Sequence, residues 1–267
     1  MHRLLAVARA YSLGMLTYRT RTLVSLLSVL VAVVPVYFVA AALQPLAAKA
    51  IASESSEYFT YLIVGSVASF VIAEAVSAIP SLISGYITSG TLEQLLTTPV
   101  RWPSLIGGLL TYGFGWVALR ALVLLVTAWI WATSTIAWFR IVEFSAIMAL
   151  LAVAYVGVGL VAGALVLLVR SSMFVPQAVL TVSTLLGTVY FPVAVLPASV
   201  APLAPLVPMT PALRIARQLL LKDQSVMTVL PEVLQLTGWA IAGVAIGGLC
   251  FHLSLQHARR AGTLTQY

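Results

Sequence analysis

Long apolar stretches separated by short polar turns dominate the chain. A membrane-spanning helix needs roughly 20 mainly apolar residues to cross a bilayer core about 30 Å thick. Six such stretches are present, at residues 23–43, 58–84, 105–131, 141–169, 173–190 and 233–255. The strict alternation typical of barrel strands is absent from them. The pattern predicts an all-α membrane protein with six transmembrane helices, forming one domain over residues 1–267.

Three segments outside these spans have their own character. Residues 1–21 place apolar side chains on one helical face and Arg3 and Arg9 off it, which predicts an amphipathic helix at the cytoplasmic interface. Residues 85–103 are too polar and proline-broken to span, and we expect a cytoplasmic loop with a short helix. Residues 191–230 are apolar but rich in proline, which no straight helix tolerates. Broken, re-entrant helices on the extracellular side are therefore expected there.

The distribution of charge agrees with a membrane location. Hydrophobic residues make up 61% of the chain and charged residues 8%, far below the roughly one quarter typical of a soluble domain. The net charge of +7 comes mostly from arginines beside the spans, which favours membrane orientation over binding to nucleic acid. The basic residues expected on the cytoplasmic side are Arg3, Arg9, Arg19, Arg21, Arg101, Arg170, Arg259 and Arg260. Those expected on the outer side are Lys49, Arg140, Arg214, Arg217 and Lys222.

This balance predicts a multi-pass protein with both termini in the cytoplasm. No convincing signal-peptide cleavage site follows the first span, so we expect that span to be retained. The preference for arginine over lysine is typical of GC-rich prokaryotic genomes, and the expected location is the inner (plasma) membrane of a prokaryote.

Several kinds of active site are excluded by the residues present. The two lysines, Lys49 and Lys222, do not follow glycine, so no phosphate-binding loop can form. Cys250 is the only cysteine, and the three histidines lack partners at metal-ligand spacing. No nucleophile or acid–base motif is recognisable. We therefore predict no catalytic residue, no metal site and no cofactor bound by this chain, which is not expected to be an enzyme by itself.

Two stretches carry a resemblance to a known family. Gly90 to Pro99 reads GTLEQLLTTP, and Tyr190-Phe191-Pro192 is followed by Leu196-Pro197 and by Thr210-Pro211, which opens an arginine-containing helix. Together they resemble the permease subunits of type 2 ABC exporters (ABC-2 type transporter permeases), which move drugs, lipids or glycans. The resemblance covers essentially the whole chain, although only these two stretches match closely.

The resemblance implies that the loop between the second and third spans contains a coupling helix that docks on an ATPase subunit. The expected ATPase-coupling residues are Gly90, Thr91, Leu92, Glu93, Gln94, Leu95, Leu96, Pro99 and Arg101. The three leucines offer an apolar stripe, while the polar members can bond to a partner surface. The alternative is an interfacial helix that touches only lipid head groups.

Polar residues within the spans are the candidates for substrate contact, because each is costly in hydrocarbon. The second span carries a polar arc of about 80° that includes Ser66, Glu74, Ser77, Ser81 and Ser84. The fifth repeats polar residues at i, i+4, i+7 and i+11. The resemblance implies that these spans line a path between two permease subunits, with Ser66, Glu74, Ser77, Gln177, Thr181, Thr184 and Thr188 as substrate-path residues. Helix packing through hydroxyl-to-backbone bonds is the alternative.

Two charges and four glycines complete the candidates within the spans. Glu74 and Arg120 lie deep in the second and third spans and either form a structural ion pair or leave Glu74 to a cationic or hydroxylated substrate. The fourth and sixth spans carry small-x-x-x-small faces that predict close helix packing. Their glycines are Gly159, Gly163, Gly243 and Gly247.

The function expected from the resemblance is ATP-driven export of an amphipathic substrate, such as a drug, a lipid or a lipid-linked glycan. The chain would pair with a second permease half, most simply a second copy, and with two copies of a separate ABC ATPase subunit that carry ATP and Mg²⁺. An ATP-independent secondary transporter or channel is the main alternative. A membrane-embedded enzyme and a non-transporting anchor for an ATPase regulator are the others.

Overall fold

The computed structural model describes residues 19–90, 102–132, 138–169, 174–222 and 224–260. These residues form α-helices and short 3₁₀ helices, with no strand among them. The long helices are α2 (Arg19–Ile51), α3 (Tyr58–Thr88), α5 (Trp102–Trp131), α6 (Ile141–Val169) and α9 (Leu230–Arg260). The shorter ones are η1 (Trp138–Arg140), α7 (Phe174–Leu186), η2 (Val193–Val195), η3 (Ala201–Leu206), α8 (Met209–Lys222) and η4 (Val226–Val229). The prediction of an all-helical protein is confirmed for this part of the chain.

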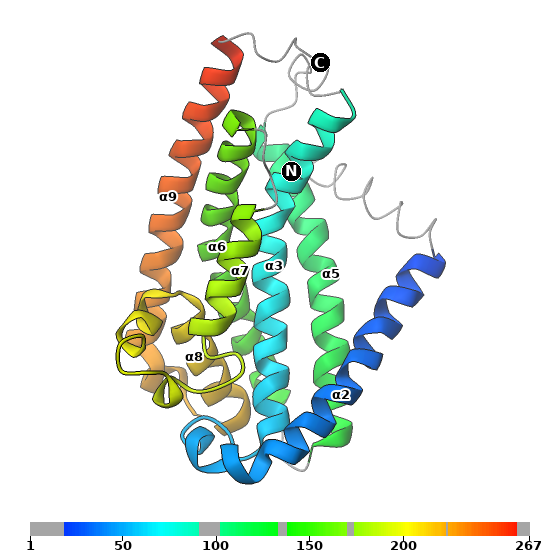
Figure 1. The fold of residues 1–267 in the computed structure, drawn as a ribbon, viewed down its shortest axis with the longest axis vertical. Helices are drawn as coiled ribbons and strands as arrows, with labels where there is room; N and C mark the ends of the chain where they lie inside the picture. Colours follow the sequence, from blue (N-terminus) through cyan, green and yellow to red (C-terminus); the bar gives the residue numbers. More distant parts are fainter. Residues whose placement is uncertain (1–18, 91–101, 133–137, 170–173, 223, 261–267) are drawn as a thin grey trace.

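Helix α3 is the central element of the bundle. It packs against α2 and α5 on one side, α6 on the other, and α7 and α8 (Figure 1). Of its span, 67% is buried, against 17% of the α2 and α9 spans. Within the described ranges, five helices are long and apolar enough to cross a membrane, and α7 is a shorter apolar helix.

Glycines set the close packing of α6 with its neighbours. A methyl group added at Gly247 of α9 would collide with the backbone of Gly157 in α6. On another face of α6, Gly159 lies against the Ala75 carbonyl of α3, and Gly163 against Ile79. The glycine-rich faces predicted for close approach therefore serve two different interfaces, α6 with α9 and α6 with α3.

The bundle has two distinct ends. We call the end with the α2–α3 connection and α8 the α8 end, and the opposite end, where α3 finishes, the Gly90 end (Figure 1). Helix α8 is amphipathic, and its buried face includes Leu213, Ala216 and Leu220. It lies beneath α7 and against α3, α6 and α9. The chain from residue 187 to residue 229 thus folds back on the bundle without crossing it.

Helix α7 is shorter than the span expected at residues 173–190. Its 13 residues rise only about 20 Å at 1.5 Å per residue, less than the roughly 30 Å of a bilayer core. The helix stops because Thr188 adopts a left-handed backbone, with φ of +62°. Hydropathy does not reveal this stop, since the residues on both sides are apolar.

Candidate functional site

The predicted ATPase-coupling segment begins where α3 ends. Gly90 closes the helix with a φ of +65°, and its N–H donates to the carbonyl of Ile87 at 3.1 Å. A left-handed residue after a helix is the position that favours glycine. Gly90 is exposed. The other coupling candidates, Thr91, Leu92, Glu93, Gln94, Leu95, Leu96, Pro99 and Arg101, lie outside the described residues. Of the interfacial helix expected at residues 1–21, residues 1–18 also lie outside them, and residues 19–21 belong to the start of α2.

Glu74, the charged member of the polar arc of α3, faces α5. The Glu74 carboxylate lies against Gly113 of α5, where an added methyl group would collide with it. Arg120 of the same helix sits over the rings of Trp116 and Phe70, at 5.2 and 5.9 Å from their centroids. Both charges that the sequence places deep in the membrane therefore lie at the α3–α5 interface.

The two serines of this arc that are substrate-path candidates are half-buried. The Ser66 hydroxyl donates to the Leu62 carbonyl at 2.8 Å, one turn earlier in α3. Ser77 lies about one turn beyond Glu74 on the same arc. The bond made by Ser66 is of the kind expected for helix packing.

Helix α7 carries the second polar stripe on its exposed side. Gln177 and Thr181 are exposed, and Thr184 is half-buried. The Thr181 hydroxyl donates to the Gln177 carbonyl at 2.9 Å, and that of Thr184 to the Thr181 carbonyl at 3.0 Å. The Gln177 side-chain amide has no such bond among the described residues. This face of α7 is uncovered and mixes polar groups with apolar ones such as Phe174, which is 79% exposed.

The two stripes do not meet within one chain. In the described ranges, no hydrogen bond joins the α3 candidates to Gln177, Thr181 or Thr184. Thr188, the last member of the predicted α7 stripe, lies beyond the helix and is buried, 2% exposed. Its contacts place it in a different site, at the α8 end.

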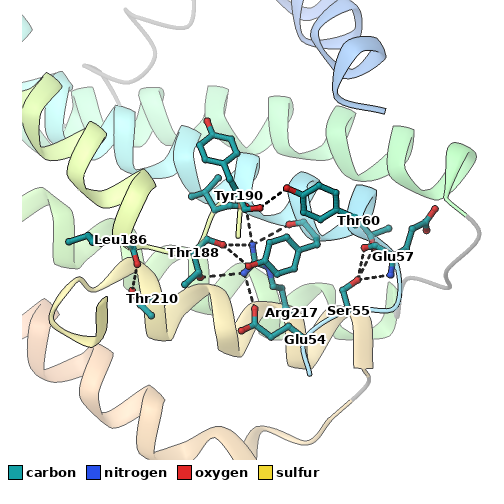
Figure 2. A network of polar contacts seen from close by, with 12 residues as sticks. Glu54, Ser55, Glu57, Thr60, Leu186, Thr188, Tyr190, Thr210 and Arg217 are labelled. Atoms are coloured by element: carbon teal, nitrogen blue, oxygen red, sulfur yellow. Dashed lines mark hydrogen bonds and ion pairs between the residues drawn. The ribbon is translucent and has the colours of Figure 1, made fainter. Parts of the chain in front are cut away.

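That site surrounds Arg217 of α8, which is fully buried at 0% exposure. Its Nη1 donates to Glu54 Oε2 at 2.9 Å, and its Nη2 donates to the Thr188 carbonyl at 2.9 Å (Figure 2). The guanidinium lies 3.4 Å from the centroid of the Tyr61 ring. We call Glu54, Tyr61, Thr188 and Arg217 the arginine cluster. It joins four segments: the α2–α3 connection, α3, the turn after α7, and α8.

The turn after α7 is held by further bonds from α3. The Tyr61 hydroxyl donates to the Thr188 carbonyl at 2.9 Å, and the Tyr58 hydroxyl donates to the Tyr190 carbonyl at 2.7 Å. Gly65 of α3 permits the approach, because an added methyl group would lie 2.8 Å from the Val189 carbonyl. The left-handed Thr188 thus turns consecutive carbonyls toward α3 and Arg217.

The start of α8 is tied to the same turn. The Thr210 hydroxyl donates to the carbonyls of Ala204 and Leu186, at 2.6 and 3.2 Å. Leu186 is the last residue of α7, so this bond satisfies a carbonyl that its helix leaves open. The proline-rich segment is therefore anchored by side-chain-to-backbone bonds rather than by helix packing alone.

The arginine cluster was missed by the reasoning from sequence, which assigned Arg217 to the outside as an orienting charge. One signal points to it. Arg217 lies four residues after Leu213 and three before Leu220, on the apolar face of an amphipathic helix. Arg214, off that face, instead makes a 3.9 Å ion pair with Glu232. A cation on a core face needs a buried anion, but sequence spacing does not identify Glu54, 163 positions away.

The described residues contain no group of three histidine, cysteine or acidic side chains placed to hold a metal ion. The arrangement connects the two ends of the bundle through one helix. Helix α3 begins at the two tyrosines that hold the turn after α7 and ends at Thr88, two residues before the exposed Gly90.

The model of the ABC-2 type transporter family matches residues 4–221. No curated protein sequence matches the chain significantly.

Proposed function

Because the chain belongs to the ABC-2 type transporter family, it is the membrane permease of an ABC transporter, and we propose that it exports an amphipathic substrate. An ABC permease pairs with an ATPase subunit that binds and hydrolyses the nucleotide. The proposed cargo is a drug, a lipid or a lipid-linked glycan, moved from the cytoplasm or the inner leaflet of a prokaryotic inner membrane. ATP and Mg²⁺ act on the partner subunit.

The uncovered polar face of α7 is the observation that carries this proposal. Gln177 and Thr181 are exposed on a helix whose neighbouring residues are apolar. A side-chain amide facing hydrocarbon without a partner costs several kcal/mol. A second permease half, in our proposal another copy of this chain, removes that cost by facing α7 across a path that admits polar substrate groups. The α3 candidates Ser66 and Ser77 then lie along the walls of the same path.

The proposed topology has six crossings with both termini in the cytoplasm. Five are the long helices, and the sixth is α7 together with the segment that folds back at the α8 end. The excess of arginine expected on the cytoplasmic side supports placing the Gly90 end inside and the α8 end outside.

The mechanism follows from the continuity of α3. Residues 90–101 form the proposed coupling helix that rests on the ATPase. When ATP binding closes the ATPase pair, this segment moves and carries the Gly90 end of α3 with it. The opposite end of α3 bonds to the turn after α7 through Tyr58 and Tyr61. A tilt of α3 is thereby passed to α7, the helix proposed to line the path, and hydrolysis resets it.

Co-purification tests the assembly. The chain is expressed beside each candidate ABC ATPase, and a stoichiometric complex of two permeases and two ATPases is expected with one of them. Substrate-dependent transport in proteoliposomes should then require ATP. Transport by the chain alone, with no ATPase and no ATP, would contradict the proposal and favour a secondary transporter or channel.

The coupling assignment has a sharper test. The double variant Glu93→Ala/Leu95→Lys should lower permease-stimulated ATP hydrolysis at least tenfold, because it removes a polar contact and places a charge in the apolar stripe. The matched control, Glu232→Ala/Leu203→Lys, makes the same two changes at the α8 end, where Leu203 is 48% exposed. Equal stimulation by both variants and the wild type would remove residues 90–101 from the coupling role.

A further inference from the structure

A cavity of about 660 Å³ lies between α5 and α6, on the side of the bundle away from α7. Figure 1 shows α5 and α6 on opposite sides of α3. Each packs extensively on α3, and the two pack little on each other. Val67 and Val71 of α3 form the floor of the cavity, and apolar residues of α5 and α6 form its walls. We call this space the α5–α6 groove.

The lining of the groove excludes water and polar ligands as its occupant. Ser145 is its one polar side chain, and the serine hydroxyl already donates to the Ile141 carbonyl at 2.7 Å. A water molecule needs two to four polar partners to remain in a buried space. Ser145 offers at most one acceptor, so the lining favours a hydrocarbon occupant.

The length of the groove suits a lipid acyl chain. Its lining runs from Leu110 to Leu125 on α5 and from Ile141 to Val156 on α6, which is about 22 Å along either helix. One leaflet of a bilayer core is about 15 Å deep, half of roughly 30 Å. An acyl chain that enters at the α8 end therefore lies within the groove over its whole length.

The position of the groove fits a lipid of the leaflet at the α8 end. Its limit at the α8 end is Ile141, which follows Arg140 and Phe139 directly in the chain. Phe139 is 70% exposed, and Arg140 lies over its ring while paired with Glu143 at 3.0 Å. Aromatic and basic residues at this level mark the membrane interface, where lipid head groups lie.

We propose that the α5–α6 groove binds one acyl chain of a phospholipid from the leaflet at the α8 end, as a site separate from the transport path. The site does not depend on the identity of the exported substrate. Its function is to fill the space that the diverging helices leave beside α3, so that α5 and α6 behave as one packed unit. The groove lies on α3 next to its tyrosine-bearing end, so bound lipid stiffens the helix that we propose to transmit ATPase motion.

Filling the groove with side chains tests the proposal. Ala118 and Ala149 line it from α5 and α6, and both are exposed, so larger side chains there need not disturb the packed core. The double variant Ala118→Phe/Ala149→Phe should displace the lipid chain. The matched control is Ala146→Phe/Ala245→Phe, which makes the same changes at exposed positions of α6 and α9 that do not line the groove.

Each full-length protein is purified in mild detergent, supplied with phosphatidylglycerol carrying isotope-labelled chains, and measured by native mass spectrometry during stepwise delipidation. The wild type and the control should retain one labelled lipid per chain after bulk lipid is lost, and the groove variant should retain at least fivefold less. Equal retention by all three proteins would overturn the proposal. A groove variant that keeps its lipid but loses its dimeric mass would also overturn it, because a protein segment would then occupy the groove.

Discussion

Replacing Glu54 by glutamine keeps the size of the side chain and removes the charge that balances Arg217. The arginine is fully buried, and its 2.9 Å bond to Glu54 is its one contact with an anionic side chain among the described residues. Carbonyl oxygens and the Tyr61 ring still face the guanidinium, but they carry no full charge. Removing one partner of a buried ion pair costs about 3–5 kcal/mol, and these remaining contacts favour the lower end of that range.

The expected consequence is a large loss of thermal stability. A loss of about 3 kcal/mol in the free energy of unfolding corresponds to a fall of roughly 6–12 °C in the midpoint temperature for a chain of this size. Differential scanning fluorimetry of the purified protein in detergent, at one fixed heating rate, measures it. The control is Arg214→Met in the same helix, since Arg214 is 42% exposed and its ion pair at 3.9 Å is worth less than about 1 kcal/mol.

A double replacement separates the effect of losing the ion pair from the effect of leaving one buried charge uncompensated. Glu54→Leu/Arg217→Met removes both charges and fills the site with apolar side chains, a change that is often neutral or stabilising in buried pairs. We expect its midpoint to return to within a few degrees of the wild type. If Glu54→Gln unfolds at the wild-type temperature, or if the double variant is as unstable as the single one, a buried ion pair does not hold this end of the bundle.

Two further predictions concern α3 and α7. Gly65→Ala should destabilise the fold by about 1–3 kcal/mol, because its methyl group would lie 2.8 Å from the Val189 carbonyl. Gly85→Ala should not destabilise it, because the space around the added methyl group is open. The thermal unfolding midpoints of the two variants compare the two effects directly. Gln177→Leu should leave the protein folded and bound to its ATPase but lower transport at least tenfold, because it removes the exposed amide of α7 from the proposed path. Unchanged transport in proteoliposomes would exclude Gln177 from the path.

The general architecture of this protein was predictable from the sequence because hydrocarbon selects long apolar helices. Hydropathy measures how strongly a residue prefers hydrocarbon to water, and together with the positions of proline it is enough to find the five long helices and the proline-broken segment. It does not state which helices touch. The divergence of α5 and α6, although they are consecutive in the chain, depends on how both pack against α3 and leaves no periodic signature.

The candidate site was predictable only in part for the same reason. The polar stripe of α7 lies on an exposed face, as its spacing suggests, until Thr188, where a left-handed turn takes the residue out of the helix. The polar arc of α3 lies within one helix, as its spacing predicts, but spacing alone does not show that Glu74 lies against Gly113 of α5. The bond that Arg217 donates to Glu54 joins residues 163 positions apart and could be found only from the fold.

The separation of this pair also matters while the protein is being made. Ribosomes add roughly 5–20 residues per second, so Glu54 is synthesised about 8–30 s before the arginine 163 positions later that neutralises it. Helices enter the bilayer first and pack afterwards. During that interval the carboxylate must stay hydrated or be sheltered by the insertion machinery. The arrival of α8 would therefore be the event that commits the nascent chain to its compact form, and release of a truncated chain before residue 217 should leave it open to membrane proteases.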